Sequence, residues 1–231
     1  MDGNGRWATS RGLSRSDGHK AGTEAAKEFV TECLKLGVQH VTLYTFSREN
    51  WARPKEEISF LFDLLVRFMR REMDALIKQG IRLNIFGDLS ELPFTTRQAI
   101  KTAVSLSSGG SKMTLNLALN YSGRDDIMRA CKALCKKKLA PEAITEQALA
   151  AELYSAGQPD PDLVIRTSGE LRLSNFLLWE SAYSEFYFTE TYWPDFDSAE
   201  LHKALEDYAS RGRRFGKTDA QLAEAESGKN S

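Results

Sequence analysis

The sequence predicts a single α/β domain in which a mainly parallel central sheet is flanked by helices. Short segments that alternate apolar and polar residues indicate strands, as at residues 81–85 and 113–119. Segments with apolar residues at helical spacing separate them, and strands that alternate with helices are typical of parallel sheets. At 231 residues with 42% hydrophobic positions, the chain is long enough for one sizeable core and short for two.

Each predicted element has its own signal along the chain. Apolar residues at helical spacing predict a helix over residues 18–36, and Gly37 supplies its C-terminal stop. β-Branched and aromatic residues predict a strand over 38–46, and Pro54 begins a long helix that ends at Gly80. The remaining predicted strands are residues 81–85, 113–119 and 163–165.

Bulk composition limits the partners and the location of the protein. Lys and Arg total 31 against 32 for Asp and Glu, so no strong field favours a nucleic-acid partner. The three cysteines are odd in number, which argues against a disulfide framework and fits a reducing cytosol. No run of about 18 apolar residues exists, so a spanning helix is not predicted. We assign residues 1–216 to the domain and 217–231 to a polar, frayed tail.

Ligands of parallel sheets bind where strand ends meet helix starts, so polar segments that follow strands are candidate sites. The sequence has four of them, at residues 46–53, 87–88, 120–124 and 166–174.

The opening of the chain combines a carboxylate, two glycines, an amide, an arginine and an aromatic residue. These residues are Asp2, Gly3, Asn4, Gly5, Arg6 and Trp7. Backbone amides at a helix start and an arginine bind phosphate oxygens, and Asp2 can hold a magnesium ion that bridges to a diphosphate. The alternative is an ordinary glycine turn. Arg15 and His19 follow, and His19 would meet bound phosphate at the start of the first helix, although a lone histidine is usually structural.

Two further segments combine arginines with hydroxyl groups. Residues 46–54 join a hydroxyl, an amide, two arginines and two aromatic residues, which suits an allylic diphosphate; the alternative is an N-capped helix start. Residues 166–176 carry two arginines and several hydroxyls around Gly169, which predicts a second anion site. Two diphosphate sites in one chain point to a reaction that joins two diphosphate substrates.

Glu185 lies in an otherwise apolar stretch, so we expect it to have a partner. It pairs with an arginine or joins Asp2 as a metal ligand, and its position alone favours neither.

With these motifs in order, the chain resembles the bacterial cis-prenyltransferases along nearly its whole length. The resemblance rests on residues 1–8, 18–22, 46–47, 49–51, 53–54, 165–167, 169–170, 174–179 and 193–196. It implies the cis-prenyltransferase fold, a homodimer in the cytoplasm, Mg²⁺ as cofactor and a peripheral membrane contact for product release. It also implies that isopentenyl diphosphate is condensed in cis onto an allylic diphosphate such as farnesyl diphosphate. The product would be a long polyprenyl diphosphate such as undecaprenyl diphosphate, a lipid carrier precursor for cell-wall synthesis.

The resemblance also implies roles for single residues. Asp2 would be an essential magnesium ligand, Glu185 a second metal ligand, and Asn50 the proton acceptor, although an amide is a poor base and substrate phosphate is the alternative. The residues implied around the allylic diphosphate are Gly3, Asn4, Gly5 and Arg6. Further implied substrate contacts are Trp7, Arg15, His19, Ser47, Arg48, Glu49, Trp51 and Arg53. Isopentenyl diphosphate would be held by Arg166, Arg172, Leu173 and Ser174. Residues 214–216 resemble a C-terminal motif that reaches across a dimer interface.

Three expectations remain open at this point. Family members have a strand directly before the segment that begins at Asp2, and here only Met1 precedes it, so we expect Asp2 to fray and the translation start to lie upstream. The long helix carries a wide apolar stripe, and we expect it to wall a tunnel for the growing chain on one side and to pack in the core on the other, although core packing alone is the simpler account. The residues of the stripe are Ile58, Leu61, Phe62, Leu65, Phe68 and Met69. The alternative to an enzyme is an inactive partner subunit of a cis-prenyltransferase.

Overall fold

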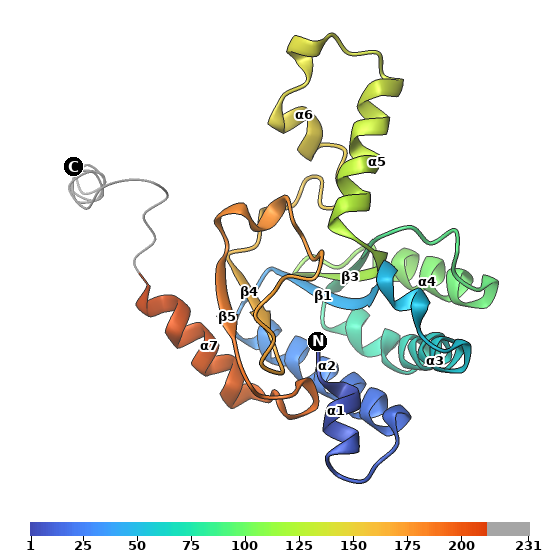
Figure 1. Ribbon diagram of the computed structural model, residues 1–231, viewed down its shortest axis with the longest axis vertical. Coiled ribbons are helices and arrows are strands. Elements are labelled where there is room, and N and C mark those ends of the chain that lie inside the picture. The colour runs from blue at the N-terminus through green and yellow to red at the C-terminus, as the bar shows by residue number, and fades with distance from the viewer. Residues whose placement is uncertain (212–231) are drawn as a thin grey trace.

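The computed structural model describes residues 1–211, in which helices separate the first four strands along the chain and the fifth strand follows the fourth without an α-helix between them (Figure 1). The strands are β1 (His40–Ser47), β2 (Ile81–Phe86), β3 (Met113–Tyr121), β4 (Leu163–Arg166) and β5 (Glu185–Phe188). The helices are α1 (Asn4–Thr9), α2 (Arg15–Lys35), α3 (Lys55–Lys78), α4 (Phe94–Leu106), α5 (Gly123–Lys136), α6 (Glu146–Ala150) and α7 (Ser198–Ser210). Short 3₁₀ turns are η1 (Arg48–Ala52), η2 (Pro141–Ala143), η3 (Glu180–Tyr183) and η4 (Trp193–Asp195). The predicted dimer motif at 214–216 and the predicted tail at 217–231 lie outside the described residues.

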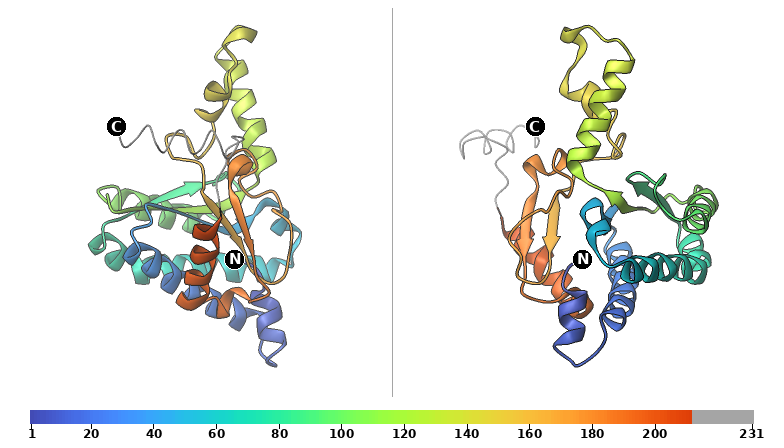
Figure 2. Two further views of the ribbon diagram at one scale, coloured as in Figure 1. Left: turned by 90° about the vertical axis from the view of Figure 1, so that its left-hand side faces the viewer. Right: turned by 45° about the vertical axis from the view of Figure 1, so that its right-hand side comes forward.

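Every strand pair in residues 1–211 is parallel, as predicted. β3 lies between β1 and β2, so Leu115 is opposite Val41 on one side and Leu83 on the other. β4 and β5 form a second, two-stranded parallel sheet. The pairing is therefore divided between two sheets, and the N-terminus lies between them (Figures 1 and 2).

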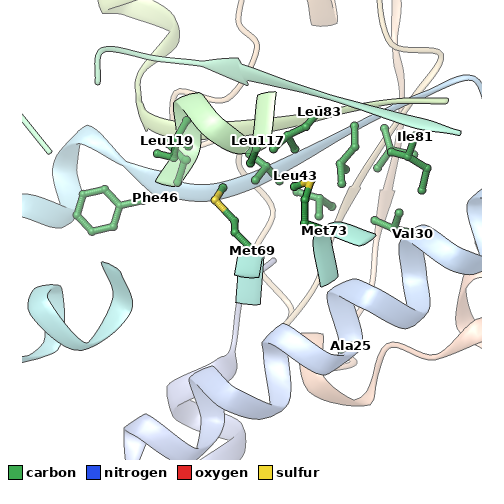
Figure 3. Close-up of a cluster of buried hydrophobic side chains, with 14 of the residues drawn as sticks. Ala25, Val30, Leu43, Phe46, Met69, Met73, Ile81, Leu83, Leu117 and Leu119 are labelled. Atoms are coloured by element: carbon green, nitrogen blue, oxygen red, sulfur yellow. The ribbon is translucent and has the colours of Figure 1, made fainter. Parts of the chain in front are cut away.

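The main core fills the space between the three-stranded sheet and helices α2 and α3. Figure 3 shows Met69 and Met73 projecting from α3 toward Leu43 and Leu117 on the strands, with Val30 of α2 beside them. Each of these five side chains is at most 8% exposed. Burial of such side chains stabilises the fold by about 1.5–3 kcal/mol each, so this layer fixes the strands whose ends carry the candidate site.

The opposite face of the sheet is covered by the chain that follows α6. Phe86 and Tyr121 pack there with Leu177, and Phe176 stacks on Tyr44 at 4.7 Å between ring centroids. Helices α5 and α6 project away from both sheets (Figures 1 and 2). Within residues 1–211 no helix is both long and apolar enough to cross a membrane.

Candidate active site

A cavity of about 1310 Å³ separates the two sheets and reaches the carboxyl ends of β1 and β4. Most of the predicted site residues line it: Asp2, Gly3, Asn4, Gly5, Arg6, Arg15, His19, Ser47, Glu49, Asn50, Arg53, Arg166, Arg172, Leu173 and Ser174. These residues come from the chain start, α2, the turn after β1 and the segment after β4. Convergence of polar segments at strand ends, predicted from the sequence, is therefore what the structure shows.

Asp2 is held in place by its backbone. Its N–H donates to the Thr167 hydroxyl at 2.9 Å, and that hydroxyl donates to the Asp2 carbonyl oxygen at 2.9 Å. The Trp193 N–H donates to the same carbonyl at 3.0 Å. The expectation that Asp2 frays is thus wrong, because Thr167 after β4 and Trp193 of η4 form hydrogen bonds with the main chain of Asp2.

The Asp2 carboxylate lies between two arginines. Arg166 donates to Oδ2 at 3.0 Å, Arg6 lies 3.6 Å from Oδ1, and the Gly3 N–H donates to Oδ1 at 2.7 Å. Burial alone would raise the pKa of Asp2, but the hydrogen bonds from Arg166 and Gly3 bring the pKa below its ordinary value. The carboxylate is therefore ionised at neutral pH and faces the cavity.

Glycine is required at position 3 by both backbone and space. Gly3 has φ of 95°, and a Cβ there would lie 2.8 Å from the Ser168 Cβ and 2.6 Å from the Tyr192 ring. Helix α1 begins at the next residue, so the opening segment is a left-handed turn into a helix rather than an isolated turn. This close approach brings Arg6 to Ser168, whose hydroxyl accepts from Arg6 at 2.7 Å.

His19 is positioned by a carboxylate that the sequence analysis did not assign. Glu57 Oε1 lies 3.3 Å from His19 Nε2 and accepts from Arg53 at 3.1 Å. Burial lowers the pKa of His19 below its ordinary value, and Glu57 opposes that shift. The signal for Glu57 was its place four residues after Arg53, in the first turn of the helix that follows Pro54, where we interpreted it only as part of the helix start.

The second group of anion-binding side chains follows β4. Arg166 donates to the Ser174 hydroxyl at 2.8 Å and to the Arg172 carbonyl oxygen. Arg172 pairs with Glu170, which also pairs with Arg6 at 3.0 Å. Arg166 therefore contacts both the Asp2 carboxylate and the loop after β4 that carries Arg172 and Ser174.

Asn50 lies at the end of β1 with a fixed orientation. Its Oδ1 accepts from the Ser47 N–H at 3.1 Å, so the amide caps the η1 turn. The N-capped start that the sequence analysis left as an alternative is present, and the same residues line the cavity.

Three predicted substrate contacts lie outside the cavity lining. Trp7 donates to Asp195 at 2.6 Å, and Arg48 pairs with Asp125 at 3.0 Å. Trp51 donates to Asn120 at 2.8 Å and packs on the aromatic core beside β1. Each of the three is engaged by protein groups in the described chain, and their roles as substrate contacts stay predictions.

Glu185 is not brought to Asp2. It begins β5 opposite Leu163 and pairs with Arg211 at 2.8 Å, which is the arginine ion pair that the sequence left open. Asp2 contacts the other end of the strand pair, at Arg166. Three residues of strand separate those ends by roughly 10 Å. Among residues 1–211 no group of three or more His, Cys, Asp or Glu side chains could hold a metal ion by itself.

Comparison with known proteins matches this arrangement to one family. Residues 1–216 match the prenyltransferase family model described as "Putative undecaprenyl diphosphate synthase". Isoprenyl transferase of Clostridium tetani is 50% identical over 94% of this chain and 86% of its own length. That of Agrobacterium fabrum is 46% identical over 97% and 93%.

A solved structure shares the fold as well as the sequence. Lavandulyl diphosphate synthase from Lavandula x intermedia, crystallised with dimethylallyl diphosphate, superposes with a TM-score of 0.91. It is 37% identical, over 94% of this chain and 95% of its own. The family model covers both segments that contribute arginines to the cavity, and the relatives cover most of the chain. This protein therefore belongs to the undecaprenyl diphosphate synthase family of isoprenyl transferases.

Proposed function

We propose that this chain condenses isopentenyl diphosphate in cis onto an allylic diphosphate, with farnesyl diphosphate as primer, to make a long polyprenyl diphosphate such as undecaprenyl diphosphate. The observation that carries the proposal is the presence of two groups of anion-binding side chains around one cavity. Arg6 and His19 belong to the first group, and Arg166 and Arg172 to the second. One head group would need only one such group, whereas a condensation of two diphosphates needs both.

An apolar cavity beside the site supports a prenyl substrate. It has a volume of about 160 Å³ and shares seven lining residues with the cavity of about 1310 Å³ between the sheets: Met1, Asn4, His19, Leu43, Thr45, Leu61 and Trp193. Five residues of the predicted tunnel stripe line it: Leu61, Phe62, Leu65, Phe68 and Met69. Ile58 of the same stripe is buried in the core without lining this cavity. A hydrocarbon tail can therefore leave the head-group site along α3.

Asp2 fits a magnesium ion that is held partly by substrate. Mg²⁺ is commonly bound through one or two carboxylates, substrate phosphates and waters, so one ionised carboxylate open to the cavity is an adequate protein donor. When bound there, Mg²⁺ would supply positive charge to the departing pyrophosphate. Glu185 as a second ligand remains part of this proposal and has no support from contacts within residues 1–211.

The chain's own residues can perform the remaining steps. Arg6 and His19 would bind the allylic diphosphate and stabilise charge as its C–O bond breaks to release pyrophosphate. Arg166, Arg172 and Ser174 would hold isopentenyl diphosphate so that its double bond attacks the allylic carbon. Loss of a proton then forms the new double bond. Because the Asn50 amide is a poor base, a substrate phosphate oxygen is the better acceptor, with Asn50 orienting the substrate.

The same proposal includes a cytoplasmic homodimer that contacts a membrane peripherally to release its lipid product for cell-wall synthesis. The family assignment supports it.

Incorporation of radiolabelled isopentenyl diphosphate, with farnesyl diphosphate and Mg²⁺, tests the function. We expect long-chain product from the parent protein and at least a thousandfold lower turnover from Asp2→Ala, with a melting temperature close to that of the parent. A fold-competent parent that incorporates no label would favour the inactive partner subunit instead. Turnover by Asp2→Ala comparable to the parent would contradict the role of Asp2.

A further inference from the structure

A cluster of charged side chains lies in the wall of the apolar cavity, where α2 meets α3. Glu72 of α3 is only 5% exposed. Lys27 of α2 lies 2.8 Å from its Oε2, and Arg71 lies 2.5 Å from its Oε1. Arg71 also pairs with Glu24 of α2 at 2.6 Å. Two ion pairs, Lys27–Glu72 and Glu24–Arg71, therefore connect the two helices.

Burial alone would raise the pKa of Glu72, but the hydrogen bonds from Lys27 and Arg71 bring the pKa below its ordinary value, so the ion pairs favour contact between α2 and α3. Removing a carboxylate from water costs several kcal/mol, and a buried ion pair can often be replaced by apolar residues without loss of stability. The residues of α3 next to Glu72 that line the cavity are apolar, including Phe68, Met69 and Met73, and Thr23 and Thr31 line it one turn on either side of Lys27. A charged pair in such a wall therefore calls for a functional explanation.

The volume of the cavity indicates what that function is. A cavity of about 150 Å³ holds one benzene molecule, which has six carbons. The cavity of about 160 Å³ therefore has room for little more than one five-carbon isoprene unit. A longer chain requires one wall to move.

The wall that can move is the pair of helices. The opposite wall is the three-stranded sheet, which is fixed by its ladder of hydrogen bonds. Figure 3 shows α2 and α3 facing that sheet with Val30, Met69 and Met73 between them. Glu72 lies fifteen residues beyond Glu57 of the head-group site, or about 22 Å along the helix, so only a chain that has grown along α3 reaches it.

We propose that the ion cluster of Lys27, Glu72 and Arg71 is a clasp between α2 and α3 that limits how far the cavity widens and thereby sets the length of the product. This inference rests on the proposed function. Each condensation lengthens the hydrocarbon, and the clasp resists the separation of the helices that a longer chain demands. Growth of the hydrocarbon stops when it no longer fits in the cavity while these ion pairs hold α2 against α3.

Product length in two variants tests the clasp. Glu72→Gln removes the buried charge and leaves Lys27, whose side chain is 48% exposed, free to turn to solvent. Lys27→Met removes the cross-helix partner at a position that is already half open. The matched control is Lys35→Met, which removes an exposed pair with Glu32 on the same helix and does not line the cavity. The dephosphorylated products are compared by chromatography at one substrate ratio.

We expect both cavity variants to shift the mean product by at least one five-carbon unit toward greater length, with the rate of the first condensation within about twofold of the parent. Lys35→Met is expected to give the parental distribution. Unchanged or shorter products from folded variants would overturn the clasp, and so would failure of Lys27→Met to fold, since the pair would then be purely structural. A parent protein that makes no product would contradict the proposed function, which is a separate outcome.

Discussion

At the scale of single residues, His19 shows how two neighbours set the charge of a side chain. Burial disfavours the charged imidazolium, while the Glu57 carboxylate at 3.3 Å favours it, and burial prevails, so the pKa of His19 is lowered. With a pKa below about 6.5, the ring is mainly neutral at pH 7. His19 would then bind phosphate through an N–H group that Glu57 helps to orient.

Replacing Glu57 by Gln tests this balance. We expect the pKa of His19 to fall further, because the variant loses the carboxylate that opposes burial. A charged hydrogen bond contributes about 1.5–3 kcal/mol, so kcat/KM should fall roughly 10- to 100-fold. An NMR titration of the His19 ring and steady-state kinetics measure the two effects. A His19 pKa that is unchanged or raised in the variant would contradict the proposed role of Glu57.

The lowered pKa of His19 also makes the stability of the folded protein depend on pH. The folded protein binds the His19 proton less tightly than the unfolded chain does, so this residue reduces stability as pH falls below about 6.5. Unfolding by urea at pH 7.5 and pH 5.5 should therefore show a larger loss on acidification for Glu57→Gln than for the parent.

At the scale of elements, the position of the anion-binding residue Arg6 depends on close packing of α1 against α2. A Cβ on Gly18 would lie 2.1 Å from the Asn4 carbonyl oxygen, and a Cβ on Gly22 would lie 2.1 Å from Asn4 Oδ1. Ala8 of α1 is fully buried in the same contact. The glycines of α2 therefore determine where α1 lies, and with it Arg6.

Gly18→Ala should accordingly displace α1. Alanine in a helix interior gains about 0.5–1 kcal/mol over glycine, whereas overpacking against backbone costs about 1–3 kcal/mol, so the net effect is destabilising. We expect a lower melting temperature and a fall in kcat/KM of at least tenfold. Gly109→Ala is the control, since no atom lies within 4 Å of a Cβ there. Equal behaviour of the two variants would contradict the packing argument.

The sequence predicted the long elements because their patterns are strong. The helix expected over 18–36 is α2, and the helix expected from Pro54 to Gly80 is α3. β5 was not predicted, because its four residues begin with Glu185 and show neither alternation nor the continuous aliphatic run by which the equally short β4 was found. α1 was not predicted because glycines at 3 and 5 are typical of loops, and its stability comes from tertiary contact with α2 rather than from helix propensity.

At the scale of the whole molecule, the site exists because two sheets carry their strand ends to one cavity. The order of strands and polar segments predicted that the segments after β1 and β4 converge, and the cavity lining confirms this for Asn50 and Arg166, which Asp2 joins from the chain start. It could not show that Glu185 begins a strand whose far end reaches the site, because that depends on strand direction and register. The hydrogen bond between Trp7 and Asp195 could not be predicted from the sequence either, since long-range side-chain contacts leave no local pattern.

This arrangement predicts that two head groups bind at once, one to each group of donors. Titration calorimetry can measure isopentenyl diphosphate binding in the presence of Mg²⁺ and a saturating, unreactive thiolo analogue of the allylic diphosphate. We expect one molecule of each ligand per chain, because Arg166 and Arg172 follow β4 whereas Arg6 and His19 belong to α1 and α2, so each ligand has donors of its own. Arg172→Ala should weaken isopentenyl diphosphate binding roughly 10- to 100-fold and leave the analogue unaffected, and His19→Ala should do the reverse. If the two ligands compete for a single site, the chain cannot hold both reactants, and the condensation proposed for it is wrong.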